Sequence, residues 1–390
     1  MTELLRRIVC VGAVGVMAAG AGTAAASASG SAASGSAAAP GWRTVYASTS
    51  QHGSDSFKDV FALGPKNAWA LGGADGSLLR HWNGTSWRAV AVPTSLVGAD
   101  QVEVGRVVAT SPKDVWVFGS AFWQDADERR VVYGLHWDGT RWTKKEFPFA
   151  RINDVITTGK PGEVWVAAAR HSCGHGKVCG PWIQRFDGKA WRKVPVPKSK
   201  AGAYRLSARK GTGVWATTDS TPVRSTAYRP GLVRWTGKRW QKVTGPKVVL
   251  PRGHEGHATD VLARGPRDVW TTITITKGGT AVNKSVLAHW NGKSWRQHVI
   301  RTKVLSALDG DGAGGIWALA GDPGRGAVQA MAHWSKGKVR FHRVPGVRNR
   351  MDSISDFTLI PGTRSVWAAG HHRRPTPMYD IQAMLWKYGA

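Results

Sequence analysis

Residues 135–142 read Leu-His-Trp-Asp-Gly-Thr-Arg-Trp, and this stretch decides the fold. Trp137 and Trp142 stand on either side of an Asp-Gly pair, five residues apart. Asp-Gly and Asn-Gly pairs accept the positive φ angles of a type I′ turn, whose twist matches that of two flanking strands. The stretch therefore predicts a β-hairpin with an aromatic residue on each strand.

The same pattern returns along the chain. Further hairpin pairs are Asn83-Gly84, Asp187-Gly188 and Asn291-Gly292. An apolar-Trp motif precedes each hairpin, and its seven copies lie 47 to 55 residues apart, at Trp69, Trp116, Trp165, Trp215, Trp270, Trp317 and Trp367. We assign the first hairpin aromatic to Trp82, Trp137, Phe186, Trp235, Trp290, Trp334 and Trp386. The residue five positions later is Trp87, Trp142, Trp191, Trp240, Trp295 and, in the sixth repeat, Val339.

Each repeat contains four short strand patterns. Residues 153–156 (Asn-Asp-Val-Ile) exemplify the first strand and residues 115–117 (Val-Trp-Val) the second, with the hairpin supplying the other two. Four strands in a unit of 40 to 50 residues is typical of a propeller blade and not of a helical solenoid. The sequence predicts an all-β fold, a seven-bladed β-propeller with four-stranded antiparallel blades.

The last repeat lacks a fourth strand, because the chain ends at Ala390 soon after Trp386. Residues 41–45 (Gly-Trp-Arg-Thr-Val) copy the fourth-strand text of residues 86–90 (Ser-Trp-Arg-Ala-Val). We therefore predict that the N-terminal strand completes the last blade, which closes the ring and protects a sheet edge. The propeller should span residues 41–390.

The first residues have the three parts of a secretory signal peptide: Arg6 and Arg7, an apolar stretch, and an Ala-rich tail. We predict a signal peptide over residues 1–28 and an Ala/Ser-rich flexible linker over 29–40. A retained membrane anchor is the alternative, but the apolar stretch is shorter than the roughly 20 residues that span a bilayer. The protein should then be a secreted monomer, extracellular or bound to the cell wall, with no membrane span after cleavage. Outside the cell, Cys173 and Cys179 are expected to form a disulfide.

The repeats, exemplified by Asp114-Val115-Trp116 followed by residues 135–142, resemble the Trp-rich propellers secreted by high-GC Gram-positive bacteria. Those proteins are described as WD40-like or as kelch- or galactose-oxidase-like. The resemblance covers the whole mature chain. It implies a propeller fold and says little about activity, because the shared motifs are structural.

In a propeller, the loops from strand two to strand three and from strand four to the next blade share one face, which usually binds. The candidate ligand-binding residues on these loops are Trp123, Asp125, Arg252, His254, Arg348, Arg350, His371, Arg373 and Arg374. Trp123 beside acidic residues resembles a carbohydrate platform, although it could equally pack its own loop. His171 and His175 beside the two cysteines could ligate a metal, but a disulfide fits an exported protein better. We expect no catalytic residues, no metal and no cofactor.

The formal net charge is +29, and such a field attracts anions. We expect a non-catalytic binding propeller whose basic loop face engages an acidic polysaccharide, a cell-wall polymer or another polyanion. Fourth-strand residues such as Arg88 and Lys144 are basic too, so the charge could be spread all round. The alternatives are an extracellular polysaccharide lyase or hydrolase that uses funnel residues, and a scaffold for another secreted protein.

Overall fold

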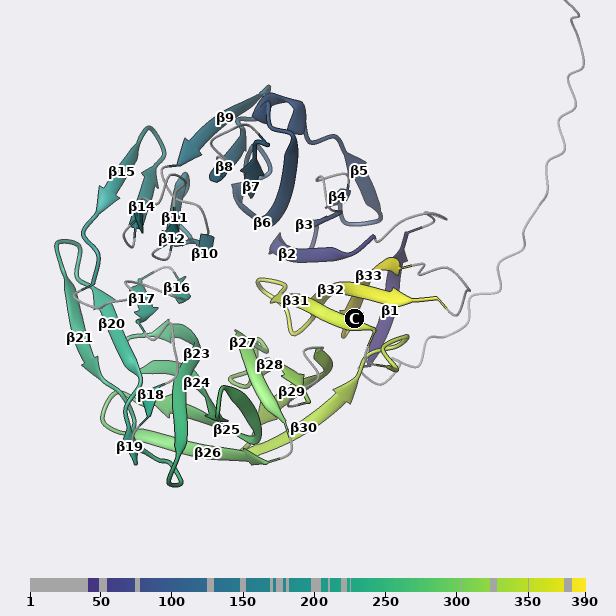
Figure 1. Ribbon diagram of the computed structural model, residues 1–390. Helices are drawn as coiled ribbons and strands as arrows, with labels where there is room; N and C mark the ends of the chain where they lie inside the picture. The colour runs from purple at the N-terminus through teal and green to yellow at the C-terminus, as the bar shows by residue number, and fades with distance from the viewer. Residues whose placement is uncertain are drawn as a thin grey trace, which may run out of the picture. The chain divides into compact units, whose positions relative to one another are not determined.

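The computed structural model describes residues 41–48, 55–73, 78–124, 130–147, 152–168, 171–172, 178–179, 182–197, 205–209, 211–218, 223–224, 226–301, 303–322, 328–349, 351–374 and 381–390. Seven antiparallel sheets, each built on the four strands of one blade, surround a central axis in chain order, and the sheet of blade five gains a fifth short strand (Figure 1). The expected seven-bladed propeller is therefore confirmed. Among the described residues, no helix is both long enough and apolar enough to cross a membrane.

In each blade, the first strand lies nearest the central axis and the others follow in order toward the outside (Figure 1). Blades one to three contain β2 (Phe57–Gly64), β3 (Asn67–Gly72), β4 (Leu78–Trp82) and β5 (Trp87–Val90); β6 (Gln101–Ser111), β7 (Asp114–Phe122), β8 (Arg130–Trp137) and β9 (Trp142–Phe147); and β10 (Ile152–Thr157), β11 (Glu163–Ala168), β14 (Trp182–Asp187) and β15 (Trp191–Val194). Blades four and five contain β16 (Arg205–Arg209), β17 (Gly213–Thr217), β20 (Gly231–Trp235) and β21 (Trp240–Thr244); and β23 (His254–Gly265), β24 (Asp268–Lys277), β25 (Thr280–Trp290) and β26 (Trp295–Arg301). Blades six and seven contain β27 (Val304–Gly310), β28 (Ile316–Gly321), β29 (Val328–Ser335) and β30 (Lys338–Arg343); and β31 (Ser353–Leu359), β32 (Val366–Arg373), β33 (Ile381–Tyr388) and β1 (Trp42–Ala47).

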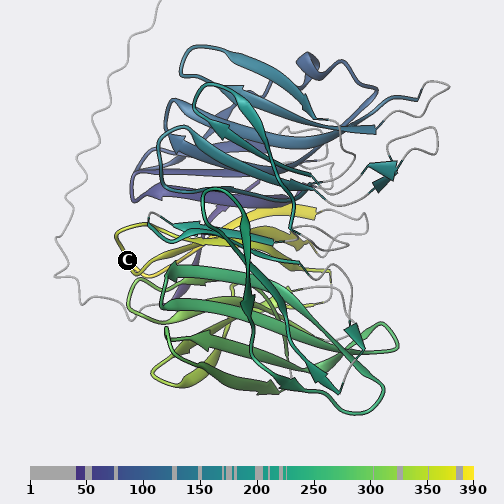
Figure 2. The same ribbon diagram turned by 90° about the vertical axis from the view of Figure 1, so that its left-hand side faces the viewer.

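The structure also contains several shorter elements. They are the pair β12 (His171–Ser172) and β13 (Val178–Cys179), the pair β19 (Ala227–Tyr228) and β22 (Val248–Val249), strand β18 (Val223–Arg224) beside β23, and a 3-10 turn η1 (Thr94–Val97). Seen from the side, the propeller has tight turns on one face and longer connections on the other (Figure 2). We call one end of the propeller the turn face. It carries the turns between strands one and two and between strands three and four of each blade. The opposite end is the loop face.

The N-terminal strand closes the ring, as the sequence predicts. Strand β1 pairs antiparallel with β33 and forms the outer strand of blade seven. Trp42 lies opposite Tyr388, as Trp87 lies opposite Trp82 in blade one. The assignment of Trp386 to the hairpin position is therefore wrong. Tyr388 occupies it, and Trp386, two residues earlier on the same face of β33, is fully buried.

The hairpins are confirmed, but their predicted turn type is wrong. A type I′ turn needs positive φ at both central residues, and at residues 83–84 and 138–139 only the glycine has it, with φ of 103° at Gly84 and 96° at Gly139. The side chain of Asp138 instead accepts the backbone N–H groups of Thr140 and Arg141, both at 2.9 Å. The Asp or Asn therefore acts as a side-chain cap of a longer turn.

A tryptophan on the second strand of every blade packs against the outer strands of the next blade. The ring centroid of Trp116 lies 5.2 Å from those of both Phe186 and Trp191. The same contact closes the ring between blades six and seven, where the centroids of Trp317 and Trp42 are 5.7 Å apart. Equivalent contacts are made by Trp69, Trp165, Trp215, Trp270 and Trp367. Because large aromatic rings dominate the energy of buried contacts, the tryptophan repeat holds the blades together.

Within each blade, the same tryptophan stacks on a cationic or imidazole side chain of strand three. The ring centroids of Trp116 and His136 are 4.1 Å apart, and His136 Nε2 lies 2.7 Å from Asp114 Oδ1. Burial would raise the pKa of Asp114, but its hydrogen bonds with His136 and Thr110 lower it. The strand-three partners are His81, His136, Arg185, Arg234, His289, His333 and Lys387. These side chains serve the fold.

Candidate functional site

The innermost strands surround a central channel with a volume of about 720 Å³. One position of each inner strand lines it, directly before a partly or fully buried apolar residue. From blade one to blade seven this position holds Asp59, Arg106, Asp154, Arg205, Asp260, Ala307 and Asp356. The channel therefore carries a ring of alternating charge, interrupted at blade six by an alanine with a positive φ of 49°.

The four carboxylates of this ring bind the adjacent blade. In each case Oδ2 accepts a backbone N–H of the next inner strand. The pairs are Asp59 with Val107 at 2.6 Å, Asp154 with Leu206 at 2.8 Å, Asp260 with Leu308 at 2.6 Å and Asp356 with Val60 at 3.3 Å. Where the ring lacks an acid, the acceptors at the remaining junctions are Thr110 for Gly162, Ser207 for Ala263 and Asp309 for Leu359. Every junction between blades is thus fastened by a side-chain acceptor.

Arg106 lies at the electrostatic centre of the channel. Its Nη1 is 3.6 Å from Asp59 Oδ1, and its side chain is 31% exposed. Burial would lower the pKa of Arg106, but the carboxylates of Asp59, Asp356, Asp154 and Asp260 raise it. Arg106 is therefore an internal counterion for the acidic ring.

Burial raises the pKa of three acids of the ring, Asp154, Asp260 and Asp356. Burial raises the pKa of Asp356 well above its usual range, and the adjacent Asp59 raises it further through charge and a hydrogen bond. Burial likewise raises the pKa of Asp260 to about 7, with Arg205 opposing the rise and Asp154 adding to it. Asp356 therefore favours its protonated form at the junction between blades one and seven.

The channel offers few free groups for chemistry. Its carboxylates already accept backbone hydrogen bonds, and no histidine lies among its described lining residues. Among the described residues as a whole, no group of three or more His, Cys, Asp or Glu side chains could hold a metal ion. The carboxylates of the channel join adjacent blades. A ligand in the channel would have to compete with their hydrogen bonds to backbone N–H groups.

Sequence reasoning missed this ring, although a signal exists. An Asp before an apolar residue recurs in the first strand of four repeats, at residues 59–60, 154–155, 260–261 and 356–357. Only the closed ring brings these residues together.

The structure places the predicted loop-face residues on several blades. Trp123 is half-buried, its Nε1 donates to the Gly98 carbonyl at 2.7 Å, and its ring packs on the core of its own blade. Arg252 is exposed, and His254 Nδ1 lies 3.2 Å from the Arg252 carbonyl oxygen. Asp125 and Arg350 lie outside the described residues. The proposed carbohydrate platform at Trp123 stays a prediction.

Blade seven does bring part of the predicted set together. Asp352 is fully buried and accepts the backbone N–H of Arg348 at 2.7 Å and that of Arg373 at 2.9 Å. Nearby, His371 Nδ1 lies 3.1 Å from Ser56 Oγ, and Arg374 Nη2 donates to the Ser48 carbonyl at 3.2 Å. This corner of the loop face is therefore ordered by a buried acid.

The predicted disulfide remains untested. Cys173 lies outside the described residues, as does His175. The backbone of Cys179 pairs with that of His171 in the hairpin of β12 and β13.

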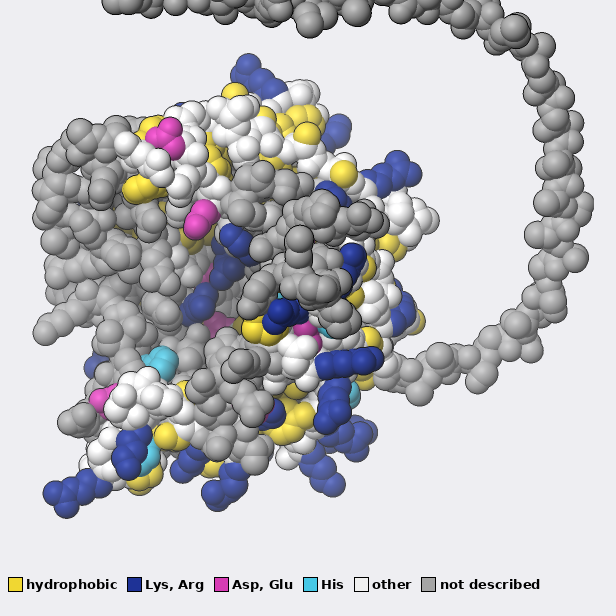
Figure 3. All heavy atoms as spheres, turned by 45° about the vertical axis from the view of Figure 1, so that its right-hand side comes forward, with side chains coloured by type: hydrophobic (Ala, Val, Ile, Leu, Met, Phe, Trp, Pro, Cys, Tyr) yellow, Lys and Arg dark blue, Asp and Glu magenta, His cyan; other side chains and the backbone are white. Residues whose placement is uncertain are grey.

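Positive charge is spread over the described surface, as the basic fourth strands suggest. Exposed cations follow the outer strands around the ring, and Figure 3 shows Lys and Arg side chains projecting along this edge. They are Arg43, Arg88, Lys144, Lys145, Arg192, Lys193, Lys242, Arg296, Arg301, Lys338, Arg340 and Arg343. The loop face is thus one of several basic surfaces.

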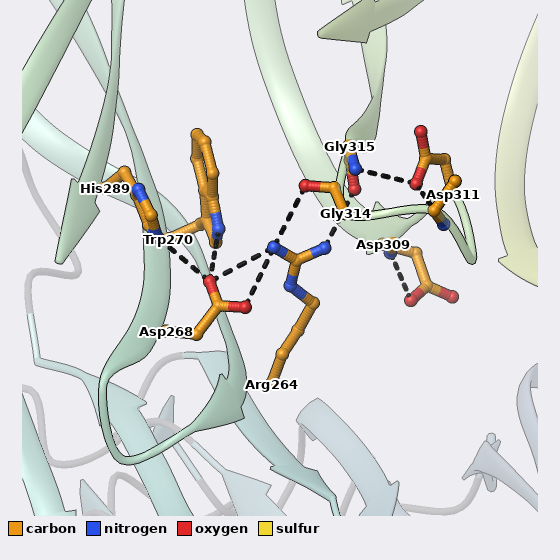
Figure 4. A network of polar contacts seen from close by, with 10 residues as sticks. Arg264, Asp268, Trp270, His289, Asp309, Asp311, Gly314 and Gly315 are labelled. Carbon is orange, nitrogen blue, oxygen red and sulfur yellow. Dashed lines mark hydrogen bonds and ion pairs between the residues drawn. The ribbon is translucent and has the colours of Figure 1, made fainter. Parts of the chain in front are cut away.

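Some cationic side chains form internal contacts that stabilise the fold, and Arg264 is the clearest case (Figure 4). Its guanidinium donates to the carbonyls of Gly315 at 3.0 Å and Gly314 at 3.2 Å, and it pairs with Asp268 at 2.9 Å. Burial would raise the pKa of Asp268, but hydrogen bonds with His289, Arg264 and Trp270 and the Arg264 charge lower it to about 2. Arg264 therefore joins blades five and six and is not available to a ligand.

Together the fold and channel define a seven-bladed β-propeller. The chain matches no family model, and no curated protein resembles it in sequence. Similar solved structures include YCF48 bound to D1 peptide, with a TM-score of 0.54 and 11% identity over 90% of this chain and 95% of that one. YCF48 from Cyanidioschyzon merolae has a TM-score of 0.51 and 11% identity over 89% and 98%. The extracellular domain of a hybrid two component system from B. thetaiotaomicron has a TM-score of 0.52 and 11% identity over 89% of this chain and 40% of that one.

At such low identity these likenesses show the fold alone. The resemblance to secreted WD40-like or kelch-like propellers stays a prediction.

Proposed function

We propose that the protein is a non-catalytic binding propeller that engages an acidic polymer outside the cell. One observation carries this proposal: exposed Lys and Arg side chains extend around the described outer strands, while the core acids are engaged in fastening blades. A surface of one sign attracts the opposite charge over a distance set by the ionic strength. The signal-peptide pattern of residues 1–28 supports an extracellular location.

The repeated aromatic residues support a scaffold that presents a surface. The tryptophans of the repeat are packed between blades, and the channel acids bind backbone N–H groups. A fold held this firmly is suited to binding without a change of shape. YCF48, which has a similar fold, is bound to D1 peptide in its solved structure.

The experiment is retention of the purified protein on immobilised poly(glycerol phosphate), with uncharged dextran as the matched control. We expect retention at about 0.05 M salt and release as salt rises, because binding to a polyanion frees condensed counterions. Dextran should not retain the protein. Poly(glycerol phosphate) and alginate incubated with the protein should keep their chain length.

Two outcomes would contradict the proposal. Retention on dextran that ignores salt would indicate recognition of neutral glycan, with Trp123 as the residue to test. Shortening of either polymer would indicate an enzyme, as in the alternative that uses funnel residues.

A further inference from the structure

We propose that the turn face is the surface that binds the acidic polymer, and that this polymer carries a phosphate in each repeat. The inference rests on the proposed function and names its surface and ligand class. It differs from the sequence prediction, which places the site on the loop face.

Exposed cations occupy the turn face in all seven blades. They lie in the turns between strands one and two or between strands three and four, at Lys66, Lys113, Arg141, Lys160, Lys189, Lys238, Arg239, Arg267, Lys293, Lys336 and Arg364. Because antiparallel strands place these two turns at the same end of each blade, the cations share one face. A polymer that crosses the face meets a cation on every blade.

A repeated packing contact positions several of these cations. The stem of Lys113 lies against Gly139 of the facing turn, so that a Cβ added to Gly139 would come within 2.8 Å of the Lys113 Cβ. The same close approach joins Lys66 to Gly84 and Arg267 to Gly292. A long cationic side chain can bury its stem in this way while its charged end stays in water. The glycines thus hold cations of three blades at equivalent positions.

Few carboxylates oppose this charge. Among the described turn residues, Asp138 is the one exposed acid, and its carboxylate caps its own turn. Of the other acids at this end, Asp187 pairs with Arg192 and Glu163 with Lys160, while Asp114, Asp268 and Asp311 bind His136, His289 and His333. The turn face therefore presents a net positive charge.

The chemistry of the face favours a polymer recognised by its charge. Most of its cations are lysines, whose compact ammonium groups bind phosphate oxygens as point charges, without a fixed orientation. The exposed large apolar side chains of the described residues, Leu96, Val249, Val299 and Phe341, lie outside these turns. Nucleic-acid bases would thus find no stacking platform on the described turns.

The test compares three variants of the full chain, each of which loses three charges. The turn variant is Lys66→Gln, Lys113→Gln and Arg267→Gln, since glutamine retains an alkyl stem for the glycine contact. The loop variant is Arg252→Gln, Lys277→Gln and Arg348→Gln, and the outer-strand variant is Arg88→Gln, Lys145→Gln and Lys242→Gln. Retention on poly(glycerol phosphate) is measured at graded salt, and thermal melting confirms that each variant folds.

We expect the turn variant to bind most weakly, with a slope of log affinity against log salt that is shallower by about 2, at about 0.7 per lost phosphate contact. Monomeric glycerol phosphate should not compete, because binding depends on many contacts at once. Equal losses in all three variants, or the largest loss in the loop variant, would overturn this surface and leave the proposed function intact. Tighter retention of polyglutamate of equal length would overturn the phosphate polymer. Tighter retention of single-stranded DNA would overturn recognition by charge alone, since its bases would then contribute. If the wild-type protein is not retained at all, the proposed function itself fails.

Discussion

Among single side chains, Asp356 shows how the channel couples protonation to stability. It accepts the Val60 N–H with one oxygen and lies beside Asp59, and its pKa is raised by burial and by that neighbour. A carboxyl whose folded pKa is raised binds more protons in the folded protein than in the unfolded chain. Stability from this group is therefore present below its unfolded pKa, near 4, and is lost as the pH rises through its folded pKa. Asp260, with a pKa of about 7, acts in the same direction.

Asp356→Asn tests this coupling, because asparagine imitates the protonated acid. The wild-type melting temperature should fall between pH 5 and pH 8. The variant should match the wild type at pH 5 and melt at a higher temperature than the wild type at pH 8, where the buried carboxyl of the wild type loses its proton. Thermal unfolding followed by circular dichroism at both pH values is the measurement.

Asp356→Ala is the control, since it leaves the Val60 N–H without this acceptor and should cost about 1 to 3 kcal/mol at either pH. A variant Asp356→Asn that is less stable than the wild type at pH 8 would contradict the raised pKa of Asp356.

At the scale of secondary-structure elements, the hairpins could be predicted from the sequence repeat, because the residues that form each hairpin are close together in the chain. The sequence predicts the strands, the seven blades and the pairing of β1, since residues 41–45 copy a fourth strand. It places Trp386 in the wrong register because both Trp386 and Tyr388 are aromatic and no pattern separates them. The channel ring was not predicted, since Asp154 and Arg106 are distant in sequence and meet only after closure. The cations of the turn face come from every blade, so no single motif marks that face.

Removal of residues 39–47 tests the closure. We expect the variant to lose its single cooperative unfolding transition, because β33 would expose an unpaired edge and Trp317 would lose its contact with Trp42. Differential scanning calorimetry gives the readout. Removal of residues 29–37 is the matched control and should leave the transition in place. A truncated chain that melts like the wild type would rule out a structural role for β1.

For the whole molecule, the formal net charge of +29 destabilises the compact folded state. Cations on the outer strands and the turns repel one another in the folded protein, and salt screens that repulsion. The channel ring is less affected, because its charges face one another over short distances inside the fold. Salt should therefore weaken polymer binding and strengthen the fold at the same time.

The melting temperature should thus rise by about 1 to 3 °C between 0.02 M and 0.3 M sodium chloride, as expected for a gain of about 1 to 2 kcal/mol in a chain of this size. Choline chloride at the same ionic strength should give an equal rise, since screening depends on ionic strength. A melting temperature that falls or stays constant with salt would show that self-repulsion is unimportant.

The pairing of β1 with β33 also sets an order in time. Trp42 is among the first residues of the propeller to be synthesised and Tyr388 among the last, so the partner of β1 does not exist until nearly the whole chain has been made. At about 5 to 20 residues per second, Trp42 waits on the order of 20 to 70 s. Throughout that interval the nascent chain holds an unpaired strand at its beginning. Ring closure is thus delayed until synthesis of the propeller is almost complete.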